Sequence, residues 1–364
     1  MKRRLALMPL LALFTSVAMA DPVGVSHPIA VLPDFHCTDN PATWPTTCFE
    51  KAQQVIQESC VALDLARAEH PDLSGPSPYW GQCEYTLAPT RVPTVALLMH
   101  GMFEDGRQLA PEAAWLAKHG IPVLNVVLAG LGQTNELANE VNYQDWIEEA
   151  ERAIRLARAL GDRVILVGHS TGGALSAYLG IKYPDAVAAA ILVEPAIRVS
   201  NLVQTGACVS QHGIANVADY PGLLKIYGVD PKDLHNRIIA PSSGCQVKEI
   251  RGAALAFLAQ EPTQDVIEEQ WGRKELNKSR AWGEAFKAPL LLFNNKHDIV
   301  VDPDQNEAFA EGIALNGFAK TVTFNQDLKT PHGSITFSHV NWILSELEPF
   351  LKSQGLLSGN SAQP

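Results

Sequence analysis

Short apolar runs alternate with longer amphipathic segments from Cys83 onward. Strands are expected at 84–88, 94–99, 122–128, 163–168, 187–193, 289–294 and 320–325. Helices are expected at 107–119, 143–160, 170–183, 303–315 and 338–353. Strands and helices that alternate in this way are typical of a mostly parallel sheet with helices on both faces. The pattern therefore predicts a doubly wound α/β fold.

Two regions interrupt this alternation. Residues 21–82 are rich in proline and cysteine, contain one predicted helix at 48–69, and are interpreted as an extension stapled onto the main domain. Between Ala196 and Phe286, the stretches RGAALAFLAQ and VIEEQWGRKEL have helical spacing, which favours a folded insertion over a surface loop. The predicted units are a leader at 1–20, the extension at 21–82, a core at 83–196 and 286–353, an insertion at 197–285 and a tail at 354–364.

The first twenty residues have the pattern of a secretory signal peptide. Lys2, Arg3 and Arg4 form a basic start, residues 5–17 are largely apolar, and Ala18-Met19-Ala20 is a small-residue cleavage site. The apolar stretch is too short to span a membrane, and no later stretch reaches roughly 18 apolar residues. The chain is therefore expected to be exported, to the periplasm or beyond, without stable membrane insertion.

Composition and charge narrow the range of partners. The chain has 364 residues, of which 46% are hydrophobic and 18% charged, and this balance is typical of a globular protein rather than a disordered one. The formal net charge is −11 and becomes more negative when the basic leader is removed. A negative surface repels phosphate backbones, so nucleic acid is not expected as a partner.

The cysteines favour disulfides over metal binding. Their even number, six in an exported chain, is typical of a disulfide framework, although sequence alone leaves the pairing open. Four cysteines precede the sheet and are expected to bridge among themselves, whereas Cys208 is expected to pair with Cys245 in the insertion. The spacings match no zinc site, and neither Cys-x-x-Cys nor His-Glu-x-x-His occurs. The sequence therefore predicts no metal site and no cofactor.

One stretch combines strand, turn and helix around a serine. The apolar run VILV at 164–167 leads into GHSTG, with Ser170 at its centre, and ALSAYLGIKYP continues with helical spacing until Pro184. A turn this sharp places the serine in a strained conformation, and Gly168 and Gly172 avoid the clashes that side chains would cause there. The hydroxyl would then lie above the amino end of a helix, where developing negative charge is stabilised.

This strand–turn–helix resembles the nucleophile elbow of the α/β-hydrolase superfamily, whose members place Ser, Asp or Glu, and His in that order along the chain. The resemblance implies an acid after the strand in APLLLFNNKHDIVVDPDQ, and Asp298 matches it. Asp302 and Asp304 compete, but they are better explained as the amino end of the next helix. Glu194 is a further alternative, since some members of the family place their acid there. Asn295 replaces a glycine common in this pattern.

The general base is expected after the last strand, in LKTPHGSITFSHVNWIL. His332 lies in the loop, where an imidazole can lie between Asp298 and Ser170. His339 lies at the start of the final helix and is expected to be structural. His100, His169 and His297 lie beside motifs but do not fit the position of the base in the chain.

The resemblance also implies two backbone donors for an oxyanion. One is the amide of Thr171, directly after the nucleophile. The other is the amide of Met102, because TVALLMHGMF resembles the family's His-Gly-x element. Such donors lower the barrier to acyl transfer by about 3–4 kcal/mol each.

Residues 83–352 resemble the superfamily throughout, and VVLAGLGQT followed by Asp145-Trp146 resembles the carboxylesterase and monoacylglycerol-lipase branch, although Leu131 replaces a loop histidine. An insertion such as 197–285 is where this family commonly carries a cap over the active site. The resemblance implies a serine hydrolase acting on small-molecule esters with an apolar acyl group. An amide or peptide hydrolase of the proline-iminopeptidase kind and a non-catalytic binding protein on the same fold remain as alternatives.

Overall fold

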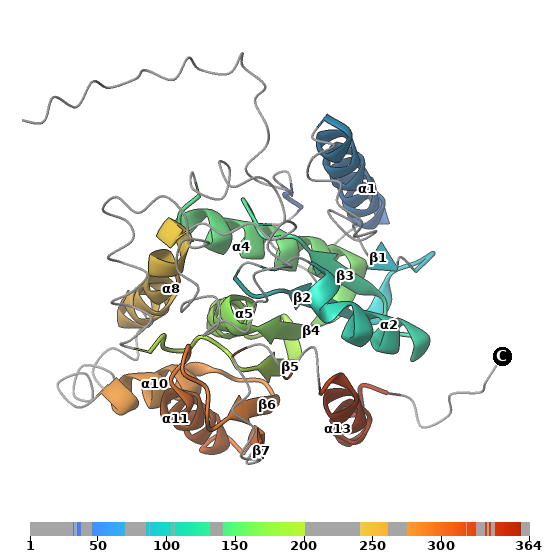
Figure 1. Ribbon diagram of the computed structural model, residues 1–364. Coiled ribbons are helices and arrows are strands. Elements are labelled where there is room, and N and C mark those ends of the chain that lie inside the picture. The colour runs from blue at the N-terminus through green and yellow to red at the C-terminus, as the bar shows by residue number, and fades with distance from the viewer. Residues whose placement is uncertain are drawn as a thin grey trace, which may run out of the picture.

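A seven-stranded sheet forms the centre of the computed structural model (Figure 1). The structure describes residues 32, 35–37, 46–69, 85–86, 88–102, 104, 106–131, 141–200, 241–260, 275–317, 319–324, 332, 335 and 339–357. The predicted leader and Cys208 lie outside the described residues. The backbone of Cys245 is described, but its side chain is not.

The sheet has the order β1-β3-β2-β4-β5-β6-β7. Its strands are β1 (Tyr85–Thr86), β2 (Val92–Met99), β3 (Val123–Val126), β4 (Gly161–His169), β5 (Val187–Val193), β6 (Leu290–Asn295) and β7 (Ala319–Phe324). Among the described strands, the β1–β3 pair is antiparallel and every other neighbouring pair is parallel. The carboxyl ends of the parallel strands therefore lie at one edge of the sheet, which confirms the predicted fold class.

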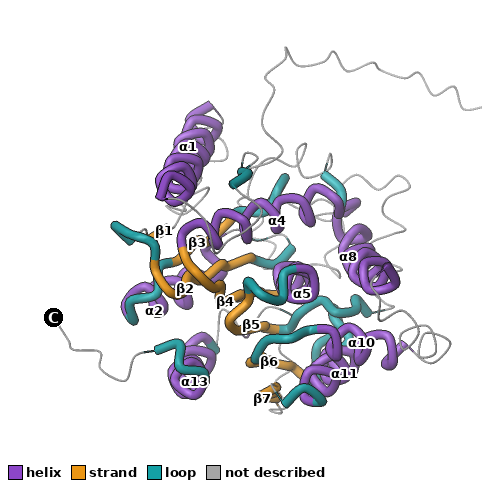
Figure 2. The backbone as a smooth tube through the Cα atoms, turned by 180° about the vertical axis from the view of Figure 1, so that it is seen from behind, coloured by secondary structure: helices purple, strands orange, loops and turns teal. Residues whose placement is uncertain are grey.

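Helices cover both faces of the sheet (Figures 1 and 2). One face packs against α2 (Ala110–Lys118) and α13 (Val340–Ser353) through a core that includes Leu98, Leu116 and Leu347. The other packs against α4 (Tyr143–Leu160), α5 (Ser170–Lys182) and α11 (Pro303–Ala314). The short 3-10 helix η3 (Gly106–Leu109) precedes α2, so the single helix predicted at 107–119 is divided, with Pro111 in the first turn of α2, where no amide is needed.

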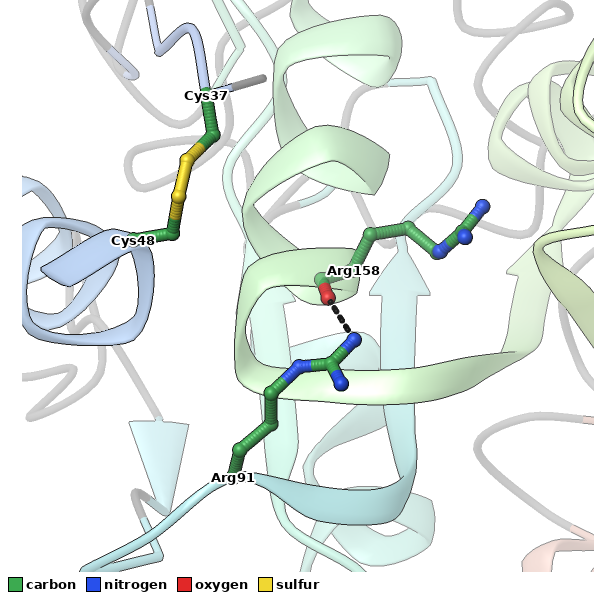
Figure 3. Close-up of a disulfide and its surroundings, with 4 residues drawn as sticks. All are labelled: Cys37, Cys48, Arg91 and Arg158. Carbon is green, nitrogen blue, oxygen red and sulfur yellow. Dashed lines mark hydrogen bonds between the residues drawn. A yellow bond between two sulfur atoms is a disulfide. The ribbon is translucent and has the colours of Figure 1, made fainter. Parts of the chain in front are cut away.

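The helix predicted at 48–69 is present as α1 (Thr46–Glu69) and is joined to the main body. Phe35, Phe49 and Ile56 are buried in the same core cluster as α4. The amide of Leu32 donates to Glu149 Oε1 at 2.8 Å, and a disulfide joins Cys37 to Cys48 (Figure 3). The extension is therefore stapled and packed as expected, while the pairing of the other cysteines stays a prediction.

Arg91 ties the first long strand to the end of α4. Its Nη2 donates to the carbonyl of Arg158 at 3.1 Å (Figure 3). The same nitrogen donates to the carbonyl of Gly161 at 3.1 Å. Carbonyls in the last turn of a helix lack intrahelical donors, so a guanidinium there satisfies them. The same contacts hold the beginning of β4, the strand that leads to Ser170.

Two helices of the predicted insertion are described. Helix α8 (Pro241–Gln260) packs its buried side chains, including Ile250 and Ala254, into the core shared with α4 and α5. Helix α10 (Glu275–Ala285) packs on α11. The rings of Trp282 and Phe309 meet edge to face there, with their centroids 5.6 Å apart. The helical spacing at 251–260 is confirmed; that at 266–276 lies mostly outside the described residues. A cap over the site stays a prediction.

None of the helices in the described part of the chain is both long and apolar enough to cross a membrane.

Glu112 in α2 is a buried carboxyl whose ionisation opposes folding. It is 0% exposed, and neither of its oxygens has a hydrogen-bond partner among the described residues. Burial raises the pKa of Glu112 from 4.5 to about 7, against the opposing effect of its own backbone amide. A carboxyl with a raised folded-state pKa stabilises the fold below its unfolded pKa and loses that contribution as pH rises through the folded one.

We therefore expect the free energy of unfolding to fall by roughly 3 kcal/mol between about pH 4.5 and pH 7 because of this group. Glu112→Gln should remove that part of the pH dependence, as measured by urea unfolding at pH 5 and pH 8. Glu50→Gln, on the exposed side of α1, is the matched control and should leave the slope unchanged. Parallel curves for Glu112→Gln and the unmodified protein would contradict the interpretation.

Candidate active site

Ser170 occupies a strained turn between β4 and α5, as predicted. Its φ is 49°, in the left-handed region that residues with a side chain rarely adopt, and the residue is 6% exposed. A Cβ atom at Gly172 would come within 1.9 Å of the Met99 carbonyl oxygen, so only glycine fits there. Gly172, two residues after the serine, therefore lets α5 begin directly against the end of β2, and the serine hydroxyl lies at the carboxyl edge of the sheet.

His332 links Ser170 to Asp298. Its Nε2 lies 2.8 Å from Ser170 Oγ, and its Nδ1 lies 2.7 Å from Asp298 Oδ2. A carboxylate only accepts hydrogen bonds, so Nδ1 carries the proton and Nε2 is left to accept the hydroxyl proton of the serine. The structure thus brings together three residues that are far apart in the sequence, in the order acid, imidazole, hydroxyl.

The loop that carries Asp298 is held on both sides. Asp298 Oδ1 accepts hydrogen bonds from the amides of Val300 at 2.8 Å and Val301 at 3.1 Å. Val301 forms an antiparallel bridge with Val199, and Arg198 Nη1 pairs with Asp302 Oδ2 at 3.1 Å. The segment after β5 therefore clamps the acid loop, which leaves Asp298 Oδ2 directed at His332.

The charge of Asp298 favours a proton on His332. Burial opposes charge on the imidazole, but the negative charge and hydrogen bond of Asp298, together with the more distant Glu194, outweigh it and raise the pKa of His332. A base whose pKa is raised in this way binds the proton of an attacking serine more strongly. The site is therefore suited to general-base chemistry.

The segment expected to supply an oxyanion donor lies beside the elbow. The amide of Gly172 donates to the carbonyl of His100 at 3.1 Å, and Met102 is half-buried against the core. The amide of Gly101 donates to Gln108 Oε1 at 2.7 Å, which fixes the turn. His100–Met102 and Ser170–Gly172 are therefore neighbours; the donor roles of the Met102 and Thr171 amides stay predictions.

The competing candidates have other surroundings. Asp302 is the N-cap of α11 and accepts from the amide of Asp304 at 3.2 Å, as expected of a helix start. His339 directly precedes α13, in its N-cap position. His100 is fully buried, and its Nε2 accepts from the amide of Leu128 at 3.0 Å. Glu194 does not hold the proton-bearing nitrogen of His332; Asp298 does.

A second group of polar side chains meets beside Ser170, and the sequence did not predict that its members contact one another. Glu194 is 0% exposed and has a φ of 44°. Asn295 Nδ2 donates to Glu194 Oε1 at 3.1 Å, and His169 Nε2 lies 3.5 Å from Glu194 Oε2. The sequence contains three signals for this group: a glutamate directly after β5, Asn-Asn at the end of β6 and a histidine before the serine. None of these signals indicates that the three side chains meet.

Comparison with solved structures agrees with this topology. A structure described with the metagenome-derived lipolytic enzymes LipS and LipT superimposes with a TM-score of 0.54 at 17% identity, covering 74% of this chain and 96% of that one. The enol-lactonase from Burkholderia xenovorans LB400 superimposes with a TM-score of 0.51 at 17% identity, covering 74% and 95%. The chain has the α/β-hydrolase fold.

Comparisons of the sequence with known proteins find similarity to hydrolases. Residues 91–220 match a family model described as serine aminopeptidase, S33, a segment that ends before Asp298 and His332. The chain is 24% identical to a thermostable monoacylglycerol lipase of Bacillus sp. (strain H-257) over 246 residues, which covers 68% of this chain and 84% of the lipase.

Proposed function

We propose that this α/β-hydrolase is an exported serine esterase that cleaves carboxylic esters with an apolar acyl group. The observation that carries the proposal is the continuous hydrogen-bonded row from Asp298 through His332 to Ser170 at a strained elbow. A serine hydroxyl is nearly inert at neutral pH and needs both a base and a group that orients the base. This arrangement supplies both.

In the proposed reaction, Ser170 Oγ attacks the ester carbonyl while His332 Nε2 takes its proton. Asp298 holds the imidazole in the required tautomer and stabilises its positive charge. The amides of Met102 and Thr171 donate to the oxyanion. His332 then gives the proton to the leaving alcohol, and water hydrolyses the acyl-enzyme with His332 again as base. Every step is assigned to groups of this chain.

The ester substrate is supported by the monoacylglycerol lipase, whose similarity extends over 246 residues. An apolar acyl group is supported by Met102, whose half-buried apolar side chain packs against the core two residues after His100, the residue whose carbonyl accepts from the Gly172 amide of the elbow. A side chain at this place would line the acyl pocket while its amide serves the oxyanion.

The test combines covalent labelling with substrate profiling. A fluorophosphonate probe should add to one residue, which peptide mapping should identify as Ser170, and p-nitrophenyl esters of increasing acyl length should be turned over. Labelling should be blocked by prior incubation with substrate. A folded protein that neither reacts with the probe nor turns over any ester would favour the non-catalytic binding protein instead.

Amide hydrolysis is the second candidate, because the matched family model is described as a serine aminopeptidase. The same three residues would act on an aminoacyl amide. Parallel assays of p-nitrophenyl esters and aminoacyl p-nitroanilides separate the two, and a larger kcat/KM for the anilides would replace the ester proposal.

Export is part of the proposal. It is supported by the basic and apolar start of the chain and by the disulfide between Cys37 and Cys48, since disulfides persist in oxidising compartments. A mature protein beginning at Asp21, identified by amino-terminal sequencing of the exported fraction, is the expected result. Recovery of the full-length chain in the cytoplasm would contradict it.

A further inference from the structure

Three buried side chains from different segments meet beside the serine hydroxyl. His169, Glu194 and His332 are 2%, 0% and 8% exposed. Each offers one donor atom, a ring nitrogen or a carboxylate oxygen, that lies within 4.8 Å of the donor atoms of the other two. Two imidazoles and a carboxylate are a ligand set that zinc accepts, with bonds of about 2.0–2.2 Å.

The surroundings of His169 make it the unusual member. Neither of its ring nitrogens has a hydrogen-bond partner among the described residues. A buried imidazole without such a partner carries a cost in stability, so it needs an explanation.

The distance from His169 to Glu194 also fits a shared ion. Nε2 and Oε2 are 3.5 Å apart, longer than a good hydrogen bond. Two ligands at zinc bond lengths and a tetrahedral angle are separated by about 3.4 Å. Asn295 holds the other carboxylate oxygen, Oε1, at 3.1 Å, as outer hydrogen bonds hold metal-ligating carboxylates.

We propose that His169, Glu194 and His332 form an inhibitory binding site for a divalent transition-metal ion of the zinc class. The inhibition rests on the proposed function, because both nitrogens of His332 are engaged there. Nε2 faces Ser170 and Nδ1 faces Asp298, so an ion bound to either nitrogen breaks the hydrogen-bonded row. The second carboxylate, Asp298, adds negative charge that favours a cation at this place.

The first experiment titrates ZnCl2 into metal-free mature protein that carries no affinity tag, with a p-nitrophenyl ester as substrate. Turnover should fall by at least 90% as about one equivalent binds, and EDTA should restore it. Glu194→Gln and His169→Gln should each raise the half-inhibiting zinc concentration by roughly 30-fold or more, because loss of an outer-shell partner alone costs about 10–100-fold in metal affinity.

His297→Gln is the matched control, because it removes an exposed histidine from the neighbouring loop without touching the cluster. It should keep the zinc sensitivity of the unmodified protein. Equal inhibition of all four proteins would overturn the proposal, since the ion would then be binding elsewhere.

The second experiment does not depend on turnover. Co²⁺ should give a visible absorption band with the unmodified protein and with Ser170→Ala, and the band should be lost in Glu194→Gln. A Co²⁺ band in a protein without esterase activity would support the metal site and contradict the esterase. An active esterase with no band and no zinc inhibition would contradict the metal site alone.

Discussion

Ser170→Ala is expected to lower kcat/KM for p-nitrophenyl esters by about a million-fold, leaving a residual rate roughly 10³–10⁴-fold above that of solution hydrolysis. Loss of the nucleophile in a serine hydrolase of this kind removes the acyl-enzyme path altogether, and reductions of that order follow. Alanine is as strained as serine at a φ of 49°, so the substitution changes the hydroxyl without changing the backbone requirement. Steady-state kinetics with enzyme concentrations high enough to detect a residual rate measure the effect.

Ser176→Ala is the control for this experiment. Ser176 is buried on the same helix and donates to the carbonyl of Gly172 at 2.8 Å, but it does not contact His332. Its replacement should leave kcat/KM within a few-fold of the original value. Retention of more than 1% activity by a folded Ser170→Ala protein would refute the assigned nucleophile.

Asp298→Asn is expected to lower kcat by about 10,000-fold, because an amide in that place favours the wrong tautomer of the imidazole. The acidic limb of the pH–rate profile should also shift. Asp298 raises the pKa of His332, and a base is active only above its pKa, so removing the charge should move the limb of the residual activity to lower pH. Full pH profiles of kcat/KM for both proteins measure the two effects together.

Asp302→Asn is the matched control for Asp298→Asn. Asp302 lies in the same loop and pairs with Arg198, but its other role is to cap α11, which asparagine can also do. Activity should stay within about tenfold. If Asp302→Asn and Asp298→Asn were equally impaired, or if Glu194→Gln alone abolished activity, the acid would have been assigned to the wrong residue.

Sequence patterns over a few neighbouring residues were sufficient to predict most helices and strands of the α/β fold. The amphipathic stretch at 143–160 matches α4 to the residue, and its capping box, in which Asn142 accepts from Gln144 and Asp145 accepts from Asn142, explains why the helix begins there. Apolar runs at 163–168 and 187–193 mark strands because both faces of a parallel sheet are buried. Boundaries were less accurate at β3, which was predicted at 122–128 and runs over Val123–Val126.

Other features depend on contacts between segments far apart in the chain. The packing of α1 and Phe35 into the core of α4 has no signal in the extension itself, whose function the sequence did not indicate. Glu112 lies on an ordinary helical position, and only the elements packed around α2 bury its carboxyl and raise its pKa to about 7. The burial of the Glu112 carboxyl, and with it the rise in its pKa, therefore depends on the elements that pack against α2 and not on the helix itself.

The sequence by itself determined the α/β frame, the elbow at Ser170 and the candidates Asp298 and His332, because hydrophobic period and turn chemistry act over a few neighbouring residues. Only the tertiary structure decided which carboxylate holds His332, and that Glu194, Asn295 and His169 form a second buried group beside it. Parallel strands bring their carboxyl ends to one edge whatever their separation in the chain, so the side chains that meet there are set by sheet order and loop geometry.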